Sequence, residues 1–130
     1  MHRRPAARIP ARPEGFPMPR LRSDFFVSAH LRRLDVAAIP AALRRRGAAE
    51  AGAIFVKVDR LDGSADLYGP APQALFDEDG PGERRFSPLL QGATPLDVEE
   101  RLTKEVRFDA DLWIIEIDDR AGRHFLDLAE

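Results

Sequence analysis

Two strands joined by a tight turn give the clearest pattern of apolar and polar positions in the chain. In the first strand, residues 53–60, side chains alternate between two faces, because successive residues of a β-strand point in opposite directions. One face is aliphatic and consists of Ile54, Val56 and Val58. The other mixes an aromatic ring with charged groups and consists of Phe55, Lys57 and Asp59. This pattern predicts a central strand with one buried face and one more polar face.

The turn and the returning strand follow directly. Asp62-Gly63 is a strong signal for a tight turn, and residues 65–69 continue as the second strand of a hairpin. We expect Tyr68 on this returning strand to join Lys57 on the more polar face.

A helix is predicted to begin at Ser23 and to end near residues 35–38. Ser23 is a suitable capping residue, and Asp24 is favoured at the positive end of the helix dipole. Apolar residues recur along the segment at Phe25, Phe26, Leu31 and Leu34.

A second helix is predicted to begin at Thr94-Pro95. Thr94 is a good cap, and proline suits the first helical position, where its missing N–H costs nothing. Asp97 stands where the acid of a capping box belongs. Three aliphatic residues at i, i+4 and i+8 predict the buried side of this helix: Val98, Leu102 and Val106.

The segment between the first helix and the first hairpin is ambiguous. Residues 41–46 have helical propensity, but Pro40 and consecutive arginines also suit an edge strand. We predict an edge strand here, followed by a hairpin loop at residues 47–52 that leads into the strand at 53–60.

Strand signals also occur in the second half of the chain. Residues 70–82 are predicted as a loop, with residues 84–87 as a short strand after it. Residues 111–130 are predicted as a second hairpin that turns at residues 118–122. The segments together predict an α+β fold: an antiparallel β-sheet of about five to six strands, built from hairpins, with two main helices.

The first 20 residues differ from the rest in composition. Five prolines stand among arginines there, which blocks helix formation and leaves little apolar surface to bury. We therefore expect a disordered Arg/Pro-rich N-terminal extension at residues 1–20 and a single α+β domain at residues 21–130. The extension is either a dispensable tail, with Met18 as the true start, or a basic arm that touches an anionic partner.

Charge is distributed unevenly along the chain. The net charge is −2, but residues 1–22 hold six arginines and one glutamate, a net +5. The remaining residues hold 14 basic and 21 acidic side chains, a net −7. This acidic body argues against a nucleic-acid partner, because phosphate contacts need a basic surface.

The absence of cysteine excludes disulfides, thiolate metal sites and a cysteine nucleophile. No stretch approaches the ~18 apolar residues that span a bilayer, so no membrane partner is expected. The N-terminus lacks the apolar core of a signal peptide, which predicts a cytoplasmic location.

The sequence lacks the familiar motifs of catalysis and cofactor binding. Its three histidines have no metal-ligand spacing, none of its four serines lies in G-x-S-x-G, and residues 80–82 lack the lysine of a phosphate loop. One group of carboxylates could in principle hold a divalent ion, although a solvated acidic surface is commoner: Asp109, Asp111, Glu116 and Asp118. We expect no metal, no cofactor and no catalytic residue.

Two features remain as candidate binding surfaces. Arg32-Arg33 and Arg44-Arg45-Arg46 could converge on an anion, or they could simply end a helix and solubilise an edge strand. The more polar face of the first hairpin supplies the candidate ligand- or partner-binding residues, which are Lys57, Tyr68, Phe55 and Asp59. An open face would suit a small ligand or a peptide, whereas a covering helix would make Phe55 core and leave Lys57 reaching outward.

The chain resembles a family of short alphaproteobacterial proteins, the domain of unknown function 1491, because several motifs occur together in the same order. The motifs are the segments 22–28, 52–58, 60–63, 66–72 and 107–113. The similarity extends from about Leu21 to Leu128, which supports residues 1–20 as an extension. The resemblance implies no activity, cofactor or catalytic residue.

These observations lead to three functional hypotheses. The first is a small non-catalytic binding or interaction module whose partner is another protein or a second copy of itself. The alternative is a small-ligand-binding protein or small enzyme that uses Lys57, Tyr68 and carboxylates such as Asp59, Asp66 or Glu116. The third is weak binding of an anionic partner through the basic N-terminal arm.

Overall fold

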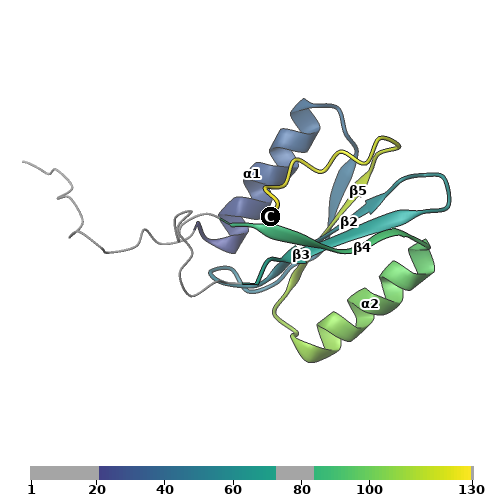
Figure 1. Ribbon diagram of the computed structural model, residues 1–130. Coiled ribbons are helices and arrows are strands. Elements are labelled where there is room, and N and C mark those ends of the chain that lie inside the picture. The colour runs from purple at the N-terminus through teal and green to yellow at the C-terminus, as the bar shows by residue number, and fades with distance from the viewer. Residues whose placement is uncertain (1–20, 73–83, 130) are drawn as a thin grey trace, which may run out of the picture.

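The protein is a five-stranded sheet with one helix on each face (Figure 1). The computed structural model describes residues 21–72 and 84–129, so the predictions for residues 1–20 and for most of the 70–82 loop lie outside the described residues. In chain order the elements are α1 (Ser23–Val36), β1 (Ala41–Arg45), β2 (Ile54–Asp59), β3 (Ala65–Pro70), β4 (Phe86–Ala93), α2 (Pro95–Phe108) and β5 (Trp113–Asp118). The predicted α+β class, two helices and strand number are confirmed.

The strand order is β1-β5-β2-β3-β4, which confirms β2 as the central strand and β1 as an edge. All pairs are antiparallel except the pair between β2 and β5, which is parallel. The prediction that the sheet is built throughout from consecutive hairpins is therefore wrong. A parallel pair needs a crossover connection, and the chain from β3 through α2 supplies it.

Residues 47–52 are not a hairpin loop, because β5 lies between β1 and β2. The segment crosses over the start of β5 instead. The Ala48 N–H donates to Asp111 O at 2.8 Å, and the indole of Trp113 donates to Ala48 O at 2.8 Å. A Cβ atom at Gly47 or Gly52 would stand within 2.4 Å of Asp111 O, so only glycine permits this close crossing.

The predicted second hairpin at residues 111–130 is also wrong beyond β5. Both edges of β5 are already paired, by β1 and β2, so no edge is available for a returning strand. The chain turns at Asp119, whose carboxylate accepts three hydrogen bonds from Arg123. It then runs along the α1 side of the sheet and meets β4, where Phe86 and Leu128 form an isolated parallel bridge (Figure 1).

The hairpin between β2 and β3 is confirmed. Its turn holds Asp62 as an acceptor for the Ser64 N–H, and Gly63 has a φ of 89°, which glycine adopts without strain. The strand predicted at residues 84–87 is longer than expected and runs from Phe86 to Ala93 as β4.

Each helix covers a separate half of the core. The α1 side contains the aliphatic face of β2 together with Val27, Leu34 and Trp113. The α2 side contains Phe55 from β2 with Val98 and Leu102 from α2. The predicted stripe of α2 is confirmed, since Val98 and Leu102 are buried and Val106 packs against them. Thr94 caps this helix, as predicted, by accepting from the Asp97 N–H at 3.1 Å.

The start of α1 differs from the prediction. The capping position is Arg22 and has no side-chain cap, while Ser23 is the first helical residue. The Ser23 hydroxyl is buried and donates to Gly52 O at 2.6 Å, so it fixes the helix to the crossing segment instead. Phe25, predicted among the apolar positions of α1, is 56% exposed.

His30 is the buried polar residue of the α1 interface. Its ring stacks on Phe26, and its Nε2 lies 2.8 Å from His124 O, which can only accept, so Nε2 carries the hydrogen. Its buried Nδ1 has no hydrogen-bond partner. Burial lowers the pKa of His30 and likewise the pKa of His124, whose Nδ1 accepts from the Leu126 N–H. Both rings are therefore held in the neutral form.

Val56→Asp should abolish folding. Val56 is fully buried in the central strand, and an unpaired carboxylate there should cost about 3–5 kcal/mol, a large share of a small domain's stability. Thermal melting followed by circular dichroism tests this. Leu96→Asp, in the exposed first turn of α2, is the control and should change stability by less than about 0.5 kcal/mol. A native-like melt of the Val56 variant would refute the assignment of the core.

Stability should fall as the pH decreases from 7 toward 5. The unfolded histidines take up protons near their ordinary pKa of about 6.5, whereas the lowered pKa values of His30 and His124 keep these two rings neutral in the folded protein. The stabilisation is complete above that ordinary value and is lost as the pH falls through the folded pKa values. Urea unfolding at several pH values measures this. His30→Phe, which keeps the ring on Phe26, should reduce the slope, and an unchanged slope would contradict the interpretation.

Candidate anion-binding cleft

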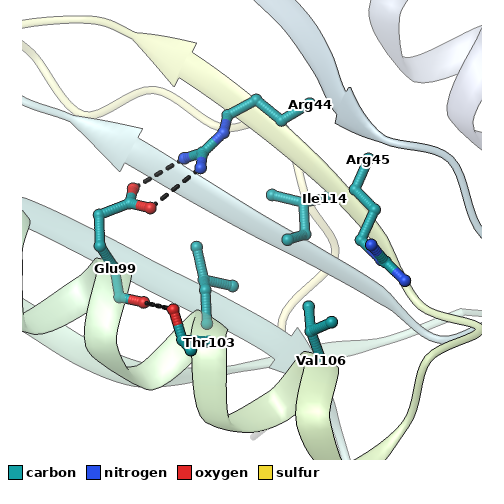
Figure 2. Close-up of a pocket in the computed structure, with 7 residues that line it drawn as sticks. Arg44, Arg45, Glu99, Thr103, Val106 and Ile114 are labelled. Atoms are coloured by element: carbon teal, nitrogen blue, oxygen red, sulfur yellow. Dashed lines mark hydrogen bonds and ion pairs between the residues drawn. The ribbon is translucent and has the colours of Figure 1, made fainter.

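A cleft of about 310 Å³ lies between the edge strand β1 and the helix α2 (Figure 2). Polar residues from both elements form its walls: Arg44, Arg45, Glu99 and Thr103. Its apolar lining comes from α2 and β5: Leu102, Val106 and Ile114. The cleft therefore combines charged walls with an aliphatic floor.

The position of α2 explains why the cleft exists. The helix packs on β3 and β4, at one side of the sheet. The strand β1 lies at the opposite edge, beyond β5 and β2, and neighbouring strands are about 4.8 Å apart. The helix therefore does not cover β1, and only long side chains bridge the space.

A β-bulge directs two consecutive arginines toward this space. Leu43 pairs with Ile115, but Arg45 pairs with Ile114, so two steps along β1 match one step along β5. Arg45 consequently lies opposite Ile114, on the α2 side of the sheet. Arg44, in the bulge, also reaches that side, where it contacts Glu99 and Glu116. A regular strand would have sent these neighbours to opposite faces.

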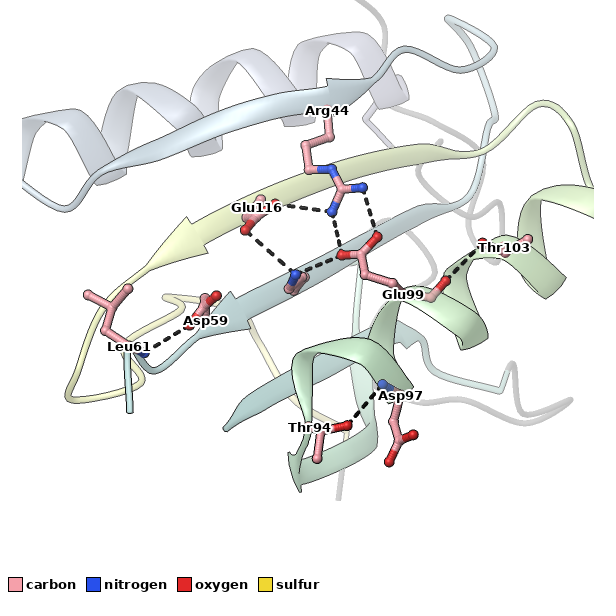
Figure 3. Close-up of polar contacts among 9 residues, drawn as sticks. Arg44, Asp59, Leu61, Thr94, Asp97, Glu99, Thr103 and Glu116 are labelled. Carbon is pink, nitrogen blue, oxygen red and sulfur yellow. Dashed lines mark hydrogen bonds and ion pairs between the residues drawn. The ribbon is translucent and has the colours of Figure 1, made fainter. Parts of the chain in front are cut away.

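Arg44 belongs to a cluster of four charged residues, each from a different element of the fold (Figure 3). It donates two hydrogen bonds to the Glu99 carboxylate, at 2.7 and 2.9 Å, and one to Glu116 at 3.1 Å. The Lys57 ammonium lies 2.7 Å from Glu99 and 3.7 Å from Glu116. The cluster ties α2 to β1, to β2 and to β5.

The electrostatics of the cluster follow from these contacts. Hydrogen bonds from Arg44, and then from Lys57, lower the pKa of Glu99 to about 2 despite its partial burial. The same carboxylate raises the pKa of Arg44. Two cations and two carboxylates balance each other, so the cluster is neutral as a whole.

Arg45 does not belong to this neutral cluster. Its Nη2 donates to Ala110 O at 2.7 Å, and its Nε is buried without a hydrogen-bond partner. No carboxylate of the described residues forms an ion pair with it. Figure 2 shows Arg44 directed toward Glu99 and Arg45 apart from it. The lining of the cleft therefore carries one cation that no carboxylate neutralises.

The structure separates the four residues predicted as a binding face. Lys57 is covered by α2 and paired with Glu99, and Phe55 is buried in the α2-side core. Tyr68 does not share their face, because it pairs with Val56 and packs in the α1-side core. It contacts the ring of His124 there, with ring centroids 4.6 Å apart. The expectation that Tyr68 stands beside Lys57 is wrong.

Asp59 lies near a different group of carboxylates. One oxygen from each of Asp59, Glu116 and Asp118 lies within 4.8 Å of the others, so two of the four carboxylates predicted as a possible ion site lie together, with Asp59 as their neighbour. A divalent cation at this point would compete for Glu116 with Lys57 and Arg44.

The two arginine clusters also lie apart. Arg33 donates to Phe125 O on the α1 side, whereas Arg44 and Arg45 face α2. Arg46 lies over the ring of Trp113, 5.2 Å from its centroid. Only part of the second cluster therefore lines the cleft. No helix in the described part of the chain is long and apolar enough to cross a bilayer.

Solved structures with the same fold have been determined for relatives from two bacteria. The solution structure of protein Atu0922 from A. tumefaciens is 42% identical, has a TM-score of 0.74, and the match covers 85% of this chain and 96% of that one. A crystal structure of a DUF1491 family protein from Caulobacter crescentus is 34% identical with a TM-score of 0.70, covering 85% and 98%. No curated protein is detectably similar in sequence.

The family model described as "Protein of unknown function (DUF1491)" matches residues 21–127. This range contains both helices, all five strands and every residue of the cleft. The chain belongs to the DUF1491 family.

Proposed function

We propose that this protein is a small, non-catalytic binding module that holds an anionic group attached to an apolar body in the cleft between β1 and α2. The observation that carries the proposal is Arg45, an arginine on the cleft wall without a carboxylate partner. Arg45 is partly exposed, and its buried Nε has no hydrogen-bond partner, so it is well placed to bind an anion that enters the cleft.

The charge of the cleft favours an anion. Its surroundings contain three cations and two carboxylates, namely Arg44, Arg45 and Lys57 against Glu99 and Glu116, a net charge of +1. Arg44 and Lys57 are committed to the carboxylates. Arg45 uses one of its five N–H donors on Ala110 O, and a guanidinium can bind carboxylate or phosphate with two parallel hydrogen bonds.

The lining of the cleft supports a ligand that is only partly charged. Leu102 and Ile114 are buried core residues whose side chains reach the cleft, and Val106 extends this aliphatic surface along α2. Binding pockets commonly combine such surface with a few placed polar groups. An aliphatic or aromatic group of the ligand would cover the floor while its anion meets Arg45.

The same residues favour binding over catalysis. The hydroxyl of Thr103 is engaged as a donor to Glu99 O at 2.9 Å, and the carboxylate of Glu99 is held by Arg44 and Lys57. A general base or nucleophile needs a group that can change its protonation near neutral pH. The pKa of Glu99 at about 2 is far below that range. The alternative of a small enzyme using Lys57 with Tyr68 has less support, because these side chains lie on opposite faces of the sheet.

The ion-pair cluster keeps the cleft in shape. Glu99 is the only member on α2, and it connects this helix to Arg44 at the far edge of the sheet. It adds a direct tie to the pairing of β1 with β5 and the packing of α2 on β3 and β4, which place the two walls of the cleft. The cluster is therefore structural support for the cleft, and Arg45 is its ligand-binding residue.

Arg45→Met should remove binding of a small anionic probe. Phenyl phosphate carries a phosphate on an apolar ring, and titration into the isotope-labelled protein should shift the amide signals of Arg45, Val106 and Ile114. Loss of the bidentate contact should weaken binding by about tenfold or more. Arg101→Met is the matched control, because Arg101 is on α2 but pairs with Glu105 outside the cleft. Equal binding by the two variants, or no binding by the unaltered protein, would refute the proposed function.

Glu99→Gln should destabilise the protein more than Glu105→Gln. It leaves Lys57, only 6% exposed, with Glu116 at 3.7 Å as its remaining carboxylate. Because Glu99 is itself partly solvated, we expect a loss of about 1–3 kcal/mol. Glu105 forms a half-exposed pair within α2, so its variant should lose less than about 0.5 kcal/mol. Urea unfolding compares the two, and equal losses would mean that the cluster does not hold α2.

A further inference from the structure

The outer edge of β1 is open along the described part of the chain. β1 is the terminal strand of the sheet and pairs only with β5. The carbonyl of Pro40 accepts from the Asp118 N–H at 2.9 Å, and Ala42, two residues on and before the bulge, has its backbone groups on the same side, toward β5. Because these directions alternate along an antiparallel strand, the N–H and C=O groups of Ala41 and Leu43 point away from the sheet. No backbone bond joins these two residues to another described segment.

The opposite edge of the sheet is protected. The C-terminal segment pairs with the start of β4, where Phe86 donates to Asp127 O and accepts from the Ala129 N–H. Pro88 and two irregularities in the pairing with β3 interrupt the rest of that strand. Proline and bulges are the usual means of closing an edge to other chains. The two edges therefore differ, and β1 is the edge that could accept another strand.

The charge on β1 decides what kind of strand fits. Arg44, Arg45 and Arg46 follow each other at its end, and only Arg44 is neutralised by carboxylates. A second copy that paired through its own β1 would add more cations to this edge and no carboxylate, because β1 contains no acidic residue. An acidic strand would gain instead, because its carboxylates would lie next to cations.

From these observations we infer that the partner is an extended acidic segment of another protein, which adds as a sixth strand to β1 and places an acidic side chain against Arg45. The inference rests on the proposed function and specifies its ligand. An added strand would lie about 4.8 Å beyond β1, at the mouth of the cleft. Every second side chain on that strand would face α2. An apolar residue two positions away would extend over the aliphatic floor. Main-chain bonds would supply affinity and the cleft would supply specificity.

The test probe is a peptide of eight residues with threonine at every second position and with glutamate and valine by turns at the positions between, so that one face carries both the acid and the apolar residue. The same peptide with lysine in place of glutamate is its control. The labelled full-length protein should show shifted amide signals and slower hydrogen exchange at Ala41 and Leu43 with the acidic peptide only. Methylating the peptide nitrogens that would face β1 should weaken binding about tenfold or more, because two or more hydrogen bonds are lost. Methylating the nitrogens on the other edge should have no such effect.

Two protein variants separate this inference from the proposed function. Ala41→Pro removes an outward N–H without removing a bond to β5, so it should lose the peptide but keep phenyl phosphate. Arg45→Met should weaken the binding of both probes.

If phenyl phosphate binds but the methylated and unmethylated peptides bind equally, the strand-addition inference is wrong and the proposed function stands. If neither probe binds the unaltered protein, both are wrong. A peptide-independent dimer that involves β1 would show that a second copy occupies the edge, and would also overturn the inference.

Discussion

The parallel pairing of β2 with β5 is the constraint on which the rest of the structure depends. It runs from the pair Ile54–Trp113 to the pair Asp59–Asp118 and joins the middle of the chain to its last strand. Because β5 occupies the position beside β2, β1 is displaced to the edge of the sheet and the segment after it must cross over β5. The contacts of Gly47 and Gly52 with Asp111 O are the local consequence of that crossing. The crossover between the parallel strands also carries α2 to the face opposite α1 (Figure 1).

The same pairing creates an electrostatic requirement. It sets Lys57 directly beside Glu116, on the face that α2 covers. A buried ammonium is stable only with well-placed partners, and Glu99 on α2 supplies the nearest one at 2.7 Å. Two carboxylates then need a second cation, which Arg44 provides from β1. A charge placed by strand pairing thus accounts for the contacts that hold the helix and the edge strand at a fixed separation.

Local features of the sequence predicted the elements well. The strand at residues 54–59, the Asp62-Gly63 turn and the Thr94-Pro95 start of α2 each depend on neighbouring residues only, and all three are confirmed. The predicted contrast between a buried and a more polar face of that strand is wrong, because residues 54–58 are all buried. Pairing between distant strands was not predictable in this way. The run Trp113-Ile114-Ile115, apolar without alternation, did contain a hint, because parallel strands buried on both faces show such runs.

The candidate site was harder to predict than the fold. Assigning Tyr68 to a face required the register of the hairpin, and a change of one residue sends every side chain to the other face. The register pairs Tyr68 with Val56, so it lies opposite to Lys57. Arg45 could not be recognised because its direction depends on the bulge, and the cleft depends on how far α2 extends across the sheet. Neither property is encoded by a local pattern.

The arginines of β1 have two physical effects that need not compete. Charged residues on an edge strand discourage pairing between identical copies, which explains how the edge of this sheet can remain open. The same charges do not discourage an acidic strand, so protection against self-association becomes selection among partners. If protection were the only role, a lysine or arginine that simply extends into water would be sufficient. Arg45 instead lies with its Nε buried at the wall of an aliphatic cleft and gives one hydrogen bond to Ala110 O, an arrangement that holds the guanidinium in place beside the cleft.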